Sequence, residues 1–237
     1  MRLGALEQLE PVRAELRWTI AAQQLADPVR GVRIRAAELL AALPPARRPS
    51  ADQQAFDRAA AEFSAAQQLN ADRPEARSAL GSFFLNQAEP LQAEAAYRAA
   101  LGLDPAFAPA AINLSDLYRQ LGRDRDGELV LRAALAKSPD NGALHHALGL
   151  ALVRDQRYQA AIEELREAAR LEPDDAHYHY VLAIGLNSIG RRDEAMAVLR
   201  TGLERHTNNG ELLSAAINVT RALGDRAAAL RYAEQLA

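Results

Sequence analysis

Three prolines spaced by 34 residues constrain this chain more than any other sequence feature. Pro105, Pro139 and Pro173 each follow an alanine- and leucine-rich stretch, and the next step of 34 falls on Thr207. A fixed period of this length indicates repeated supersecondary units that stack on one another. Cutting the chain just after each of these sites gives five repeats, which are residues 74–107, 108–141, 142–175, 176–209 and the shorter 210–237.

The repeats share residue types at fixed positions. The seventh residue is leucine in four of the five repeats, and the eleventh is large in four. The eighth is small in four, as in Gly81 and Gly149, and the twentieth is alanine or glycine in all five. Positions 7, 8 and 11 fall on one face of a first helix, and positions 20, 24 and 27 on one face of a second. Small residues at positions 8 and 20 let the two helices approach closely.

This pattern resembles the tetratricopeptide repeat, whose 34-residue unit is a pair of helices. The resemblance covers residues 74–237 and implies an all-α, right-handed solenoid of helical hairpins. A single hairpin cannot bury its apolar face alone, so neighbouring repeats must stack. The 52 alanines, with five Phe and one Trp in 237 residues, also favour helix throughout.

Helix ends can be placed within the repeats. Gly122 and Gly190 occupy the fifteenth position, where a first helix needs a left-handed residue to stop. Asp140, Asp174 and Asp225 stand where the following helix starts, so we expect them to be the N-caps.

The first 73 residues do not follow the 34-residue pattern. Residues 27–40 resemble the second helix of a HEAT repeat, because an aspartate is followed by Val-Arg, small residues and leucines. Residues 15–24 would form the preceding helix. The expected organisation is a HEAT-like segment at 1–49, a junction helix at 50–73 and a tetratricopeptide array at 74–237.

The stretch 44–50 separates these helices. It contains Pro44, Pro45 and Pro49 around Arg47 and Arg48. Such a proline cluster predicts an exposed loop, and both arginines are expected to be open to trypsin.

Family resemblance implies that the first helix of each repeat lines a concave groove. The groove centre is then aliphatic and aromatic, with asparagine and arginine around it. Asparagine both donates to and accepts from an extended backbone, and arginine can fork onto a carboxylate. This predicts a short peptide ligand with an apolar anchor and an acidic group; the alternative is a solvated face without a single ligand. The candidate binding residues are Asn113, Asp116, Arg119, His146, Leu150, Arg154, His177, Tyr180, Ile184, Asn187, Asn218 and Arg221.

Four histidines gather near the starts of two adjacent first helices. His145 and His179 hold the fourth position, which packs between helices, so only His146 and His177 are expected to meet. Two histidines without a nearby carboxylate make a poor metal site. No metal or cofactor is therefore expected, and a groove contact that titrates near neutral pH is favoured.

Composition excludes several classes of function. The 28 Lys+Arg against 31 Asp+Glu argue against nucleic-acid binding. No uncharged apolar run approaches the roughly 20 residues of a membrane span, and the N-terminus lacks a signal-peptide pattern. Without cysteine the chain has no disulfide, thiolate metal site or attached c-type haem. No catalytic motif or glycine-rich phosphate loop is present, so we do not expect an enzyme.

These observations predict a non-enzymatic scaffold that binds a protein or peptide, cytoplasmic as the chain stands. An alternative comes from another class. HEAT-like helices followed by tetratricopeptide repeats resemble the C-terminal parts of larger exported bacterial proteins with c-type haem domains. The chain would then be a periplasmic fragment of a redox protein, and Cys-x-x-Cys-His motifs upstream in the parent reading frame would distinguish the two.

The last helix predicts weak self-association. Leu230, Ala233 and Leu236 recur at threes and form a stripe that is expected to pack within its own repeat. Ala228, Ala229 and Tyr232 broaden the stripe, and no later helix covers them. Exposed apolar surface of this kind favours association or a frayed last turn.

Overall fold

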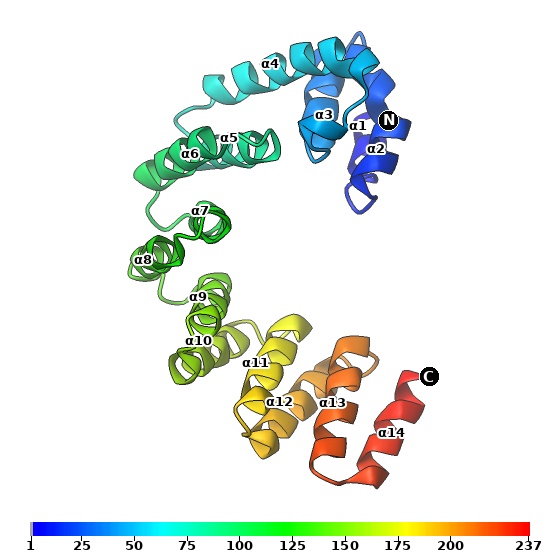
Figure 1. The fold of residues 1–237 in the computed structure, drawn as a ribbon, viewed down its shortest axis with the longest axis vertical. Helices are drawn as coiled ribbons and strands as arrows, with labels where there is room; N and C mark the ends of the chain where they lie inside the picture. The colour runs from blue at the N-terminus through cyan, green and yellow to red at the C-terminus, as the bar shows by residue number, and fades with distance from the viewer. Residues whose placement is uncertain (1) are drawn as a thin grey trace. The chain divides into compact units, whose positions relative to one another are not determined.

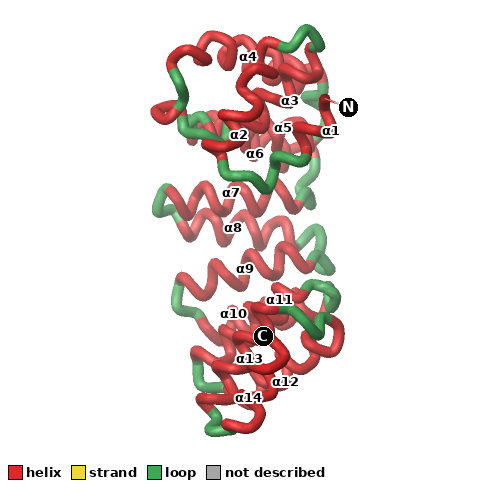
Figure 2. The backbone as a smooth tube through the Cα atoms, turned by 90° about the vertical axis from the view of Figure 1, so that its right-hand side faces the viewer, coloured by secondary structure: helices red, strands yellow, loops and turns green. Residues whose placement is uncertain are grey.

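The computed structural model describes residues 2–237, and this part of the chain is helical without strands (Figures 1 and 2). It divides into two compact units that meet between Leu121 and Gly122. The first unit contains α1 (Arg2–Glu7), α2 (Ala14–Ala21), α3 (Arg30–Leu40), α4 (Gln53–Leu69), α5 (Pro74–Asn86), α6 (Pro90–Leu103) and α7 (Ala108–Gln120). The second contains α8 (Asp124–Leu135), α9 (Gly142–Arg154), α10 (Tyr158–Leu171), α11 (Ala176–Ser188), α12 (Arg192–Arg205), α13 (Gly210–Ala222) and α14 (Arg226–Leu236).

The all-α prediction is therefore confirmed. The expected boundaries at residues 49 and 73 both fall inside the first unit and stay predictions, as does the HEAT resemblance. None of the helices formed by residues 2–237 combines the length and apolar character needed to cross a bilayer.

Close packing within a repeat depends on the small eighth residue. Helices α5 and α6 lie side by side, as do α9 and α10 (Figure 1). A β-carbon at Gly81 would lie 2.5 Å from the ring of Tyr97, and one at Gly149 would lie 2.7 Å from Leu165. In both pairs the eighth residue of the repeat faces the twenty-fourth. The predicted role of small residues at the eighth position is confirmed in these two repeats.

Two residues after the end of every first helix stands a residue with positive φ. Gly122 and Gly190, where this was predicted, have φ of 71° and 81°. Gly224 holds the same position with φ of 81°. The fifteenth residue of two other repeats is not glycine, yet Ala88 and Gln156 have φ of 62° and 60°. The repeat geometry thus imposes the left-handed turn even where an L side chain makes it costly.

The helix starts correct part of the capping prediction. Asp225 caps α14 as expected, accepting from the backbone N–H of Ala228 at 2.8 Å. The prediction was wrong for Asp140 and Asp174, because α9 and α11 begin one residue later than expected. The side chains that cap the four helices are those of Asn141, Asp175, Asn209 and Asp225.

The N-terminal helices share an aromatic core with α4 and α5. The rings of Phe63 on α4 and Phe83 on α5 stack at a centroid distance of 4.6 Å. Trp18 on α2 lies 5.6 Å from Phe56, and its indole N–H donates to Asp52 at 2.8 Å. Residues on both sides of the predicted boundary at 49 therefore bury the same apolar surface.

The proline-rich stretch at 44–50 contains a buried arginine. Arg47 is exposed, as predicted, and pairs with Glu15 at 2.8 Å. The prediction was wrong for Arg48, which is only 8% exposed. Its guanidinium donates to the carbonyl oxygens of Leu43 and Ala41 at 2.8 and 3.3 Å, and to Gln87 at 2.7 Å. These acceptors follow the ends of α3 and of α5, so Arg48 links the two helix ends.

Helix α14 packs through a different face from the one expected. Ala228 and Ala229 are buried, and Tyr232 packs against the core of the second unit. Leu230 is 61% exposed and Leu236 is 43% exposed, so the prediction that they form the inner stripe was wrong. The buried residues of α14 are Ala228 and Ala229 in its first turn, and this helix packs against α13. Self-association through this helix stays a prediction.

Candidate functional site

The candidate residues occupy first helices of the repeats, and none of the twelve is buried. Asn113, Asp116 and Arg119 lie on α7 in the first unit. The other nine lie in the second unit on α9, α11 and α13, which we call the first-helix surface. These nine are His146, Leu150, Arg154, His177, Tyr180, Ile184, Asn187, Asn218 and Arg221.

Two of the predicted carboxylate-binding arginines have acidic neighbours. On α7, Arg119 contacts Asp116 at 3.3 Å, one turn away on the same helix. On α9, the Nε of Arg154 lies 3.8 Å from a carboxylate oxygen of Asp124. A ligand carboxylate would have to displace these contacts, so both arginines are less available than the sequence suggested.

An apolar groove lies between α11 and α13. It has a volume of about 420 Å³, and the sequence-predicted residues Tyr180, Ile184 and Asn218 line it together. Leu236 of α14 and Glu211 of α13 also line the groove. Ile184 is 41% exposed, although Leu182 on the same helix is buried. The groove therefore offers apolar surface that the fold itself does not use.

A row of aromatic rings continues this surface from α11 to α9. The rings of His146 and His177 are 5.5 Å apart, so the expected meeting of these two histidines is observed. His177 also lies 6.1 Å from the ring of Tyr180. On its other side, His146 stacks on Tyr178 at 4.7 Å. The imidazole rings thus link the groove to the neighbouring repeat.

A second, more polar hollow adjoins the groove where α11 and α13 begin. Its volume is about 690 Å³. Glu211 lines both this hollow and the apolar groove, and its carboxylate lies 3.7 Å from the Nδ1 of His177. The ionisable side chains that line the hollow are Glu172, Asp174, Asp175, His177, His206 and Glu211.

The acidic groups of this hollow affect the rings nearby. Burial raises the pKa of Tyr178 to about 12, and the negative charges of Glu172 and Asp175 add to the shift. Burial also lowers the pKa of His146, and His177 lowers it further, while Asp175 acts in the opposite direction. The negative charge of Asp175 therefore acts on both Tyr178 and His146.

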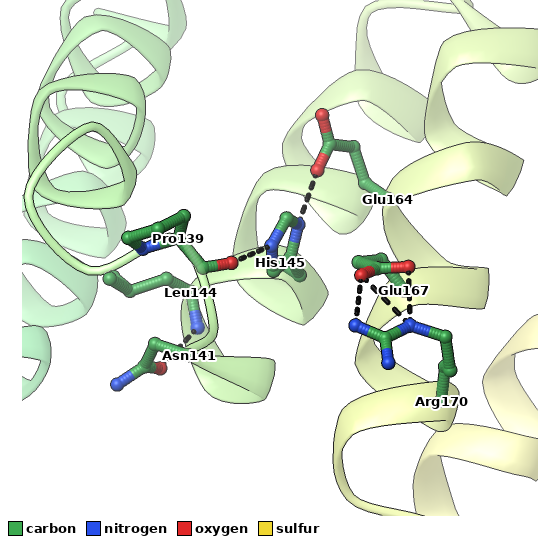
Figure 3. Close-up of polar contacts among 7 residues, drawn as sticks. All are labelled: Pro139, Asn141, Leu144, His145, Glu164, Glu167 and Arg170. Atoms are coloured by element: carbon green, nitrogen blue, oxygen red, sulfur yellow. Dashed lines mark hydrogen bonds and ion pairs between the residues drawn. The ribbon is translucent and has the colours of Figure 1, made fainter.

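Polar contacts hold the start of α9 in place (Figure 3). The Nδ1 of His145 lies 2.7 Å from Glu164 on α10, and its Nε2 lies 2.8 Å from the carbonyl oxygen of Pro139. The ring therefore bridges a carboxylate on α10 and a backbone oxygen that precedes α9. His179 repeats the carbonyl contact one repeat later, with Nε2 3.1 Å from the oxygen of Pro173.

The fourth-position histidines thus contact the loops that precede their helices. The sequence placed them between helices but did not reveal the proline carbonyl contacts. The twelve candidates did not include Glu211, although Glu211 holds the second position of its repeat, as His177 does. That positional signal was sufficient to include it.

Three buried polar atoms near this surface have no hydrogen-bond partner within the described chain. They are Nε2 of His146, Oδ1 of Asn187 and Nε2 of His206. Residues 2–237 bring no three His, Asp or Glu side chains together in an arrangement suited to a metal ion.

Family models described as tetratricopeptide repeat match residues 84–142, 126–185 and 152–218. Together these matches span more than half of the chain. The chain belongs to the tetratricopeptide repeat family. The tetratricopeptide matches include α9, α11 and most of α13, so they contain the first-helix surface except for Arg221.

Curated relatives match this chain over only a part of their own length. The peroxisomal targeting signal receptor of Eremothecium gossypii is 35% identical over 79 residues, which is 33% of this chain and 14% of the receptor. The TPR repeat-containing protein PA4299 of Pseudomonas aeruginosa is 34% identical over 92 residues, which is 39% of this chain and 38% of that protein. The chain therefore spans well under two thirds of these relatives.

Solved structures of tetratricopeptide proteins share the fold. MamA aligns with a TM-score of 0.58 at 21% identity, over 66% of this chain and 92% of that one. YrrB, described as a TPR protein with an unusual peptide-binding site, aligns with a TM-score of 0.56 at 22% identity. That alignment covers 73% of this chain and 90% of YrrB.

Proposed function

We propose that this chain is a non-enzymatic interaction scaffold and that the first-helix surface of its second unit binds an extended peptide segment of a partner protein. One observation carries the proposal. Tyr180 and Ile184 line an open groove, whereas Leu182 and Leu186 of the same helix are buried in the core. Apolar side chains in a groove between fixed helices are suited to hold an apolar anchor without a folding cost.

Polar groups beside the groove suit a peptide backbone. Asn218 and Ser214 line it from α13, and amide and hydroxyl groups can both donate to and accept from an extended chain. The description of YrrB and the name of the peroxisomal receptor support peptide recognition by proteins of this fold.

The test is selection of random dodecapeptides displayed on phage against the full chain. Selected peptides are then synthesised with a fluorophore, and their affinities are measured by anisotropy. Tyr180→Ala should weaken their binding by about tenfold or more, because a central aromatic anchor carries much of an interface energy. Tyr158→Ala is the matched control, since Tyr158 is a 43% exposed tyrosine on α10, outside the groove.

Circular dichroism of both variants checks that the fold is kept. If the selected peptides bind the Tyr180→Ala protein as tightly as the unchanged chain, the proposed surface is wrong.

A further inference from the structure

The geometry points to a ligand class for this surface: an extended segment that carries a lysine or arginine side chain beside its apolar anchor. The inference rests on the proposed function, because it names the ligand of the same groove. The charge of this side chain is opposite to that of the acidic group that the sequence predicted for the ligand.

Glu211 is the first reason. It is an exposed residue in the first turn of α13, and it lines both the apolar groove and the polar hollow. A side chain that leaves the Tyr180–Ile184 groove toward the start of α13 therefore meets a carboxylate. Long cationic side chains fit this path well, since their methylene stems pack on apolar surface while the charged end reaches solvent.

Asp175 is the second reason, because its charge exceeds what its structural role requires. Its carboxylate caps α11 by accepting from the N–H of His177 at 2.8 Å. The equivalent caps of α9 and α13 are Asn141 and Asn209, which accept from the backbone at 3.0 Å in both cases. A neutral amide is thus sufficient for capping at this position. The charge at residue 175 is an additional feature that faces the polar hollow.

The carboxylates of the hollow are only partly neutralised. Asp174 pairs with Arg205 at 2.5 Å. Within the described residues, neither Glu172 nor Glu211 has a lysine or arginine at ion-pair distance, and the nearest charged partner of Glu211 is His177. An acidic ligand at this end would add charge of the same sign, while a cationic side chain would compensate the charge already there.

The arginines of the same surface do not reverse this preference. Arg154 already faces Asp124, and Arg221 lies in the last turn of α13, the opposite end from Glu211. A cationic group next to the Tyr180 ring gains a further attraction when it lies over the aromatic face. The apolar groove, its acidic end and its aromatic wall therefore all favour the same kind of side chain.

The experiment uses the peptides selected on the full chain. We expect lysine or arginine within about three positions of the apolar residue in most of them. Each arginine peptide is resynthesised with citrulline, which keeps the shape and removes the charge. Citrulline should weaken binding by about two- to fivefold, as for an exposed ion pair, and added NaCl should reduce the difference.

Protein variants locate the contact. Asp175→Asn keeps a capping side chain, and Glu211→Gln keeps the size of the side chain, so both remove charge alone. Each should weaken the arginine peptides by about two- to fivefold and leave the citrulline peptides unchanged. Glu204→Gln, on the exposed surface of α12, is the matched control and should change neither.

The outcomes separate this inference from the proposed function. Selected peptides rich in aspartate or glutamate, or equal affinities of arginine and citrulline peptides, overturn the cationic ligand. If Tyr180→Ala still weakens binding in that case, the groove stands with a different ligand. If Tyr180→Ala changes nothing, both proposals fail.

Discussion

The guanidinium carbon of Arg48 lies 4.1 Å from the centre of the Phe56 ring. This contact places a charged side chain inside the aromatic core of the first unit, and burial lowers the pKa of Arg48 as a result. The charge is compensated by carbonyl and amide oxygens and by the ring face. Arg48 thereby joins the end of α3 to the end of α5.

Removal of this side chain should destabilise the first unit. We expect Arg48→Ala to lower the free energy of unfolding by about 2–4 kcal/mol, because packing is lost and buried carbonyl groups lose their donor. The adjacent Arg47→Ala is the control. Arg47 is exposed, so its removal should change stability by less than about 0.5 kcal/mol. Urea unfolding followed by circular dichroism measures both, and equal effects would contradict the structural role of Arg48.

The contact between Gly81 and Tyr97 gives a second prediction. A β-carbon at Gly81 would overlap the Tyr97 ring, so Gly81→Ala should force α5 and α6 apart and cost about 1–3 kcal/mol. Gly102 on α6 has open space around its α-carbon. Gly102→Ala should instead stabilise the chain by up to about 1 kcal/mol. Opposite signs for the same substitution in one helix pair are expected in thermal and urea unfolding.

The left-handed residues at the fifteenth position predict two stabilising substitutions. Ala88→Gly and Gln156→Gly relieve the positive φ at these positions and should each raise the free energy of unfolding by roughly 0.5–1 kcal/mol. Gly190→Ala, which introduces the same strain, should lower it by about 1 kcal/mol. A loss of stability in both glycine variants would show that the turn is not strained.

The partial burial of His146 predicts a pH dependence. A histidine in the unfolded chain has a pKa of about 6.5, and the pKa of His146 in the folded chain is lower. The unfolded state then binds more protons, so this contribution to stability is present above the unfolded pKa and is lost as the pH falls below it. His146→Phe keeps the ring that stacks on Tyr178 and removes the titration.

Urea unfolding between pH 5 and 8 measures this effect. The unchanged chain should lose stability relative to His146→Phe on the acidic side of that range. A difference between the two proteins that is constant across the range would mean that His146 titrates alike in both states.

The sequence predicted the repeats because their period depends on local packing rules. Leu148, Gly149 and Leu165, for example, hold positions 7, 8 and 24 of a single helical hairpin. The positional pattern also brought Tyr180, Ile184 and Asn218 into one groove. Each of these predictions needs only the residues of one repeat or of its neighbour.

Features that depend on distant contacts were not predicted. Burial of Arg48 requires acceptors at Leu43 and Gln87 together with the Phe56 ring, and no local pattern signals such a set. The exposure of Leu230 depends on which face of α14 packs against α13, and this helix carries apolar residues on more than one face. The capping residues were misplaced by one because both Asp140 and Asn141 are good caps by type.

The interchange of Asn141, Asp175 and Asn209 at one structural position has an evolutionary consequence. A single base change converts an aspartate codon to an asparagine codon, and either residue starts the helix. The electrostatic character of each repeat edge can therefore drift independently of the hydrophobic interior. A duplicated array of this kind could acquire a new binding preference through such neutral exchanges, one repeat at a time, without passing through an unfolded intermediate sequence.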